Sequence, residues 1–269
     1  MTTLLDYVRA LEGLSSRERG ERTADFLAYH GVPLQLHQYA TGTNLIVPPN
    51  RRPYVAVSAH FDVVPGSPGA NDNASAIAVL LGLVAAFQQQ PTRNLGVGFF
   101  IFDEEENQLR GSQAYVEECG TQDLEGLINL EMLGQGEHLA LWPLRPEERG
   151  RIWEIFEATC QAHTVRSERF HRQLLNTADH ESFRMMGFGE CFTLTAISDE
   201  DLAVAEHYYK ALEFEVDQAT LGEILRGAPL FHHYHRPTDL SEHLDESSLA
   251  QACLLIEATI RRLDAEQHR

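Results

Sequence analysis

The sequence is poor in basic residues. Its 269 residues include 21 lysine and arginine residues against 40 aspartate and glutamate residues, which gives a formal net charge of −19. This excess of negative charge repels phosphate groups, so the composition argues against nucleic acid and an anionic membrane surface as partners. Hydrophobic residues make up 43% of the chain and charged residues 23%, which is enough apolar material for a folded core.

The sequence also lacks paired cysteines, a leader segment and long apolar runs. Its four cysteines form no CxxC pair, so neither a disulfide framework nor a zinc-finger spacing is present. The first residues show no apolar core followed by a small-residue cleavage site. No run reaches the ~18 apolar residues that a membrane span needs. We therefore expect free thiols, a cytoplasmic location and no membrane partner.

Three short apolar segments, 55–59, 97–102 and 127–130, are typical of strands covered on both faces. Apolar residues at helical spacing predict helices around them, over the first thirty residues and at about 74–88, 112–119, 147–163, 181–187, 199–226 and 249–263. Strands that alternate with helices predict one α/β domain over residues 1–269, a three-layer αβα sandwich with a mixed, largely parallel central sheet. The segment at about 199–226 is expected to be a helical insertion.

Each predicted strand ends in side chains that can bind a metal ion. His60 and Asp62 follow the first strand, the acidic run 103–106 follows the second, and Glu131 follows the third. Because the carboxyl ends of parallel strands meet at one edge of a sheet, we expect these groups to converge. The spacing of two puts His60 and Asp62 on one face, where the carboxylate can orient the imidazole for a metal ion. A hydrogen-bonded pair without a metal is the alternative.

Two further segments carry residues of the same chemistry. Asp72 follows a turn rich in glycine, proline and asparagine. Taken alone this turn is typical of a helix N-cap, although the two oxygens of a carboxylate can also bridge two cations. The adjacent carboxylates of 103–106 repel one another, which next to a buried strand favours bound cations over a solvated loop. Three histidines within 232–235 also indicate metal binding.

Together these motifs resemble the co-catalytic di-zinc aminopeptidases, the family that includes bacterial leucyl aminopeptidase and aminopeptidase Y. The matching elements occur in order: His60-x-Asp62, Gly69-Ala-Asn-Asp72-Asn-Ala-Ser75, Glu105-Glu106-x-x-Leu109-Arg-Gly-Ser112, Asn129-Leu-Glu131-Met132 and His235-x-x-x-Asp239. The resemblance covers residues 44–135, with islands at 176–192 and 231–245. It implies a zinc-exopeptidase-like fold and hydrolysis of the first peptide bond of a peptide with a free N-terminus.

The resemblance also implies a role for each site residue. Five residues would hold two zinc ions: His60, Asp72, Glu106, Glu131 and His235. Asp72 would bridge the ions, with His60 and Glu131 on one and Glu106 and His235 on the other. Glu105 would be the general base, and Asp62 would support the site from behind. Counting back from the motif at 109–112 selects Glu105 and leaves Glu104 as an extra acid.

Some features depart from the family pattern. Glu131 stands where many of these aminopeptidases have aspartate, and Ala76 replaces a frequent glycine. One alternative is a glutaminyl cyclase, which shares the fold and most ligands but uses one zinc ion to cyclise N-terminal glutamine. A second is a non-catalytic binding protein on the same fold. The sequence assigns no oligomeric state, and it assigns no role to Asp179 and His180, which also match a family element.

Overall fold

A mixed sheet of eight strands runs through the protein in our computed structural model, which describes residues 3–171 and 178–267. The strands lie in the order β1-β2-β4-β3-β5-β8-β6-β7. They are β1 (Gln35–Gln38), β2 (Thr43–Val47), β3 (Tyr54–His60), β4 (Gly96–Phe102), β5 (Leu124–Leu130), β6 (His138–Trp142), β7 (Ser167–Arg169) and β8 (Cys191–Ile197). The predicted segments 55–59, 97–102 and 127–130 are confirmed as β3, β4 and β5.

The four central strands of the sheet are parallel, and antiparallel pairs join them to the strands on either side. Strand β3 pairs in parallel with β4 and β5, and β5 pairs in parallel with β8. Antiparallel pairs join β1 to β2, β2 to β4 and β6 to β8, while β6 and β7 are parallel. Every residue of β3 and β4 is buried, because helices cover both faces there. The predicted mixed, largely parallel sheet is confirmed.

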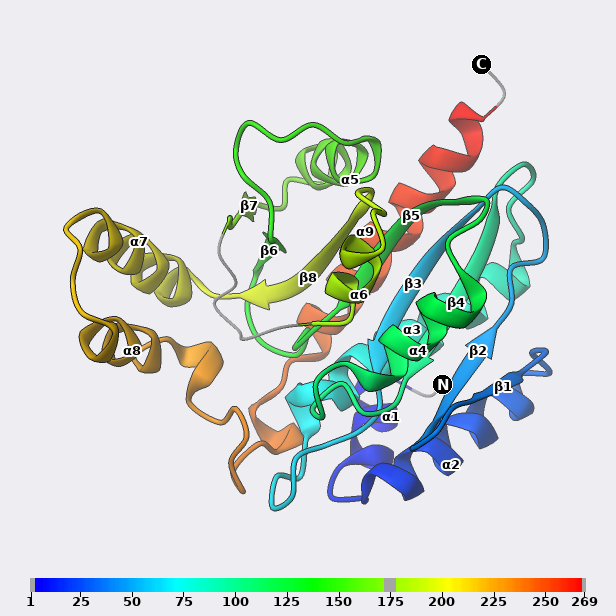
Figure 1. The fold of residues 1–269 in the computed structure, drawn as a ribbon, viewed down its shortest axis with the longest axis horizontal. Coiled ribbons are helices and arrows are strands. Elements are labelled where there is room, and N and C mark those ends of the chain that lie inside the picture. The colour runs from blue at the N-terminus through cyan, green and yellow to red at the C-terminus, as the bar shows by residue number, and fades with distance from the viewer. Residues whose placement is uncertain (1–2, 172–177, 268–269) are drawn as a thin grey trace.

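Helices form a layer on each side of the sheet (Figure 1). One layer shares the main apolar core with the sheet: α1 (Leu4–Leu11), α2 (Ser16–Tyr29), α3 (Ala76–Gln89), α5 (Arg151–Ala162) and α9 (Glu246–Glu266). The other layer consists of α4 (Arg110–Cys119) and α6 (His180–Met185), which pack on each other and on a second apolar cluster. Two helices, α1 and α2, stand where one was predicted, because Ser15 caps a new helix.

The helix at the centre of the first layer is unusually apolar. In the described part of the chain, Ala70–Gln89 is the one helical stretch long and apolar enough to cross a membrane. However, 83% of its most apolar window is buried inside the fold. Packing against the sheet and α9 accounts for this composition.

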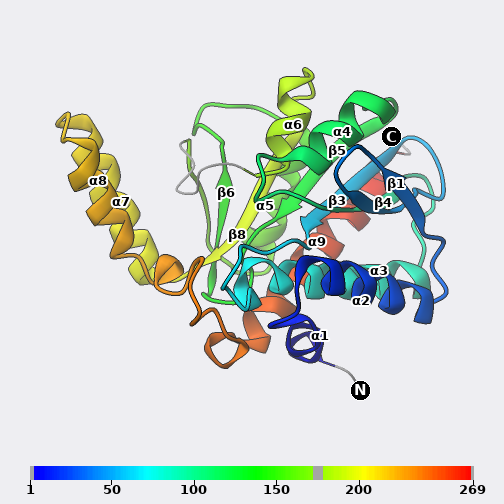
Figure 2. The ribbon, with the colours of Figure 1, turned by 60° about the horizontal axis from the view of Figure 1, so that its bottom comes forward.

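The segment predicted to be a helical insertion forms a pair of helices that projects from one end of the sheet (Figure 2). These helices, α7 (Asp199–Glu213) and α8 (Gln218–Arg226), pack on each other. They are separate because Asp217 caps the second helix with two backbone hydrogen bonds. Leu202 and Ala205 anchor the base of the pair in a third apolar cluster. At the other end, the side chain of Phe214 is 80% exposed.

Candidate metal centre

The carboxyl ends of three parallel strands meet beside an irregular turn, η1 (Ala70–Ser75), as the sequence predicts. His60 is the last residue of β3, Glu105 and Glu106 follow β4, and Glu131 follows β5. The exposed fractions are 1% for His60, 8% for Glu105 and 4% for Glu131. The convergence therefore takes place inside the protein, where unpaired charges are costly.

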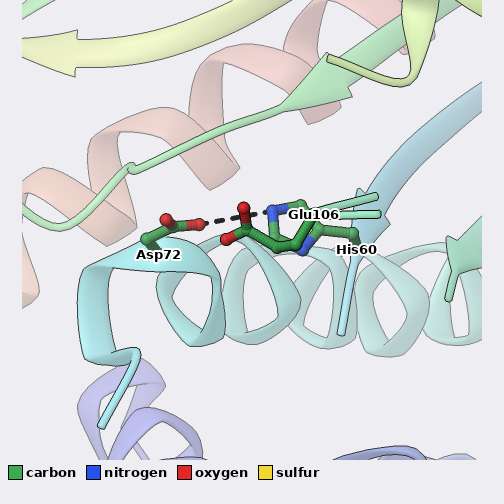
Figure 3. Close-up of side chains that lie close together, drawn as sticks. All are labelled: His60, Asp72 and Glu106. Atoms are coloured by element: carbon green, nitrogen blue, oxygen red, sulfur yellow. Dashed lines mark ion pairs between the residues drawn. The ribbon is translucent and has the colours of Figure 1, made fainter. Parts of the chain in front are cut away.

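Asp72 lies between two imidazoles. It projects from η1 toward His60 and Glu106 (Figure 3). Its Oδ1 is 3.3 Å from Nε2 of His60, and its Oδ2 is 3.1 Å from Nε2 of His235. The two oxygens of one carboxylate thus face two different nitrogen donors, which is the arrangement expected of a bridging ligand.

The predicted ligands can be divided into two groups that share Asp72, although the donor atoms of Glu106 also lie within 4.8 Å of those of His60 and Asp72, and those of Glu105 within 4.8 Å of those of His60 and Glu131. In the first group, Nε2 of His60 is 3.1 Å from Oε1 of Glu131. In the second, Nε2 of His235 is 3.1 Å from Oε1 of Glu106. Each group offers one imidazole nitrogen and two carboxylate oxygens, a donor set that suits zinc and related divalent ions. All five predicted ligands are brought together, although their roles remain predictions.

The buried atoms around these groups fit bound cations. Oε2 of Glu131 is buried, and no hydrogen-bond partner for it lies within the described residues. Glu105 lies against the first group, with its Oε2 3.9 Å from Nε2 of His60. Five carboxylates, those of Asp62, Asp72, Glu105, Glu106 and Glu131, surround two imidazoles, and the buried guanidinium of Arg19 adds one positive charge nearby. A cation in each group would compensate this buried negative charge.

Without metal ions, the pKa values of Glu105, Glu131 and His235 are raised, so these side chains hold their protons more strongly. Burial raises the pKa of Glu131 to about 7, although His60 opposes the change. Burial also raises the pKa of Glu105 well above its usual value, and the charge of Glu131 adds to this effect. Burial lowers the pKa of His235, but hydrogen bonds to Asp72 and Glu106 outweigh it and raise that pKa to about 10. Metal binding must therefore release protons.

Asp62, the residue predicted to support the site, contacts two of its segments. Its Oδ1 accepts a hydrogen bond from the backbone N–H of Glu105 at 3.0 Å, and its Oδ2 accepts one from the N–H of Glu106 at 3.1 Å. Its Oδ1 also lies 3.2 Å from Nδ1 of His60. One carboxylate thus holds the backbone of Glu105, the predicted base, and of Glu106, a predicted ligand, and it orients the imidazole of His60.

Residues outside the predicted ligand set hold Asp72 in place. Asp239 accepts hydrogen bonds from the backbone N–H groups of Asn71 and Asp72, at 2.8 Å and 3.1 Å. Gly69 has a φ of +63°, and a Cβ there would lie 2.5 Å from Nη2 of Arg19. That buried guanidinium donates hydrogen bonds to the carbonyl oxygens of Pro68 and Gly69. The sequence indicated Asp239 only as a companion of His235, and Arg19 not at all.

The turn η1 also fixes the segment that carries Glu131. Asn73 donates a hydrogen bond to the carbonyl oxygen of Leu130 at 3.0 Å and accepts one from the N–H of Met132 at 3.2 Å. The peptide bond between Asp72 and Asn73 is cis. These hydrogen bonds join the residues on both sides of Glu131 to the turn that carries Asp72. They therefore fix the position of Glu131 relative to Asp72.

Asp179 and His180 lie next to this centre and are fully buried. Burial raises the pKa of Asp179 to about 7, and its charge in turn raises the pKa of Glu105. Burial lowers the pKa of His180 to about 3, and its Nδ1 lies 2.6 Å from Oγ1 of Thr193. Asp179 thus belongs to the surroundings of the acidic residues, whereas His180 joins α6 to β8.

Comparison with known proteins identifies the family of this chain. The profile of peptidase family M28 matches residues 44–260, which is most of the chain. The chain belongs to peptidase family M28. The resemblance that the motifs indicated is thereby confirmed, and the two donor groups lie within the matched region.

Individual relatives in this family include aminopeptidases. The chain is 28% identical over 212 residues to a probable lipoprotein aminopeptidase of Mycobacterium tuberculosis. The match covers 72% of this chain and 39% of that protein. It is 40% identical over 83 residues to the aminopeptidase YwaD of Bacillus subtilis, covering 30% of this chain and 18% of that one. The chain therefore spans less than half the length of these relatives.

Solved structures share the fold. A zinc aminopeptidase from Bacillus subtilis superposes with a TM-score of 0.63 at 24% identity, covering 82% of this chain and 50% of that one. A glutaminyl cyclase from Porphyromonas gingivalis superposes with a TM-score of 0.72 at 16% identity, covering 97% of both chains. The predicted zinc-exopeptidase-like α/β fold is confirmed.

Proposed function

We propose that this protein is a zinc-dependent aminopeptidase that removes the first residue of peptides with a free N-terminus. The observation that carries this proposal is the pair of donor groups that share Asp72, with Glu105 beside them. His60, Asp72 and Glu131 would hold one zinc ion, and Asp72, Glu106 and His235 the other. Bound zinc supplies Lewis-acid chemistry and lowers the pKa of water toward ~7.

Glu105 is suited to be the general base. Within the described residues its carboxylate makes no hydrogen bond, so its oxygens are available to accept the proton of an attacking water and pass it to the leaving amine. Burial raises the pKa of Glu105, which makes its carboxylate a stronger base. Asp62 keeps Glu105 in position through the backbone. A base held by its main chain keeps its side chain free to reach the reacting atoms.

The two alternatives are less well supported. A glutaminyl cyclase needs one zinc ion, whereas the two oxygens of the Asp72 carboxylate face two different imidazole nitrogens. A non-catalytic binding protein has no need for a buried base beside two such groups. The cyclase structures of similar size share the fold alone. A cytoplasmic location stays a prediction from the sequence.

The test combines metal analysis with an aminoacyl-anilide assay on the wild type and Glu105→Gln. We expect nearly two zinc ions per chain, hydrolysis of leucyl anilide but not of its N-acetyl form, and a loss of turnover of at least about 100-fold in the variant with its metal retained. Full activity in Glu105→Gln would contradict its role as the base. Ammonia released from a glutamine-initiated peptide without free amino acid would instead indicate a cyclase. Less than one zinc ion, with no hydrolysis, would contradict the peptidase proposal.

A further inference from the structure

A cavity of about 820 Å³ adjoins the metal centre. Four segments line it: the start of α2, the hairpin of β1 and β2, the loop after β3 and the loop after β4. Asp62 and Glu106 belong both to this lining and to the metal centre. The cavity therefore begins beside the second donor group, away from Glu131.

The two donor groups differ in how open they are. In the first group, His60 and Glu131 have exposed fractions of 1% and 4%. In the second group, the side chain of His235 is 34% exposed and that of Glu106 13%. A free N-terminus fits the closed end, because no further residue precedes it. The rest of the peptide must then leave past the open end, where the cavity begins.

The cavity combines an apolar floor with acidic walls. Phe61 and Leu45 supply buried apolar surface, and Leu36 is 58% exposed beside them. The walls carry four more carboxylates besides that of Asp62: those of Glu21, Asp103, Glu104 and Glu106. Of the described lining residues only Arg17 is basic, and it is paired with Glu21 at 2.9 Å. Arg110, outside the lining, lies 3.8 Å from Glu104, and Glu106 faces the metal centre, so Glu21, Asp103 and Glu104 supply the charge that is turned to the cavity. The cavity thus keeps an excess of negative charge beside an apolar surface.

We propose that this cavity binds the residue that follows the scissile bond and favours lysine or arginine there. The inference rests on the proposed aminopeptidase function. A long basic side chain can lay its aliphatic stem on the apolar floor and keep its charged end among the carboxylates. A neutral side chain of equal length gains only the apolar contact, and glutamate is repelled. The cavity therefore sets specificity on the leaving side of the bond.

Matched dipeptides test this inference. Leu-Lys, Leu-norleucine and Leu-Glu share a first residue and differ in the charge of the second. We expect kcat/KM for Leu-Lys to exceed that for Leu-norleucine at least about tenfold, mainly through KM, with Leu-Glu the poorest substrate. Because the cavity is open to solvent, the preference should shrink as salt is added.

The variant to compare is Glu21→Gln combined with Glu104→Gln, which removes two carboxylates and keeps their shape. We expect it to reduce the Leu-Lys to Leu-norleucine ratio below about threefold. Asp25→Asn is the matched control, because it removes one charge from the exposed side of α2 without lining the cavity, and its ratio should equal that of the wild type. A wild-type ratio near one, or an unchanged ratio in the double variant, overturns the inference. If leucyl anilide is hydrolysed at the same time, the proposed function stands; if nothing is hydrolysed, both fall.

Discussion

Replacing Asp62 with asparagine should weaken zinc binding about 10-fold to 100-fold. The carboxylate is 6% exposed and accepts hydrogen bonds from the N–H groups of Glu105 and Glu106 while facing His60. Asparagine has one acceptor oxygen, so one backbone N–H must face its amide NH₂ group. An unpaired buried donor costs about 1–3 kcal/mol, and the lost charge no longer orients the imidazole. The unpaired donor is present with and without zinc, so its cost falls on folding. The loss of affinity comes from the imidazole that is no longer oriented, since a carboxylate that orients a ligating histidine typically contributes about 10-fold to 100-fold to metal affinity.

Competition against a chelator measures this zinc affinity, and Asp264→Asn is the matched control. Asp264 also accepts backbone hydrogen bonds, from the N–H groups of Arg93, Asn94 and Leu95. It does so at the opposite end of β4 from the metal centre. We expect the control to unfold at lower temperature with an unchanged zinc affinity. Wild-type affinity in Asp62→Asn would refute the reasoning that this carboxylate positions the ligands.

The remaining predictions concern stoichiometry, pH and the projecting helices. Glu131→Ala should bind one zinc ion after dialysis, because the first donor group loses a carboxylate, and two retained ions would contradict this. In the metal-free protein, burial raises the pKa of Glu131 from 4.5 to about 7, so the folded state holds a proton that the unfolded chain releases. Urea unfolding should therefore show stability falling from pH 5 to pH 8, by up to about 3 kcal/mol from this group, and a flat profile would contradict it. Phe214→Ser should change the unfolding free energy by less than about 0.5 kcal/mol, whereas Leu202→Ala should cost about 2–5 kcal/mol; equal effects would contradict the anchoring of α7 at its base.

The centre of the fold was predictable because burial on both faces leaves a continuous apolar run. Strands β3, β4 and β5 carry such runs, and their parallel direction brings the residues that follow them to one edge. The edge strand β7, with no fully buried residue over Ser167–Arg169, has no comparable pattern. Strands β6 and β8 were likewise not predicted, although their positions fix the antiparallel side of the sheet.

The candidate ligands could be proposed from the sequence because each follows a recognisable local pattern. Apart from Asp62, which the spacing from His60 indicated, the residues that position them could not, because their contacts join segments far apart in the chain. Asp239 holds the backbone N–H of Asp72 from 167 residues away. Arg19 reaches the turn before Asp72 from α2, and no motif marks it as part of the site. Such contacts depend on how the helices pack against the sheet, and the local hydrophobic pattern gives no information about that packing.

Anomalous diffraction from zinc-soaked crystals tests the central claim most directly. We expect two zinc peaks, one on each side of the Asp72 carboxylate. One should lie about 2.0–2.2 Å from Nε2 of His60 and the other at a similar distance from Nε2 of His235. A single peak, or two peaks of which one does not contact Asp72, would contradict the shared-carboxylate centre on which the proposed function depends.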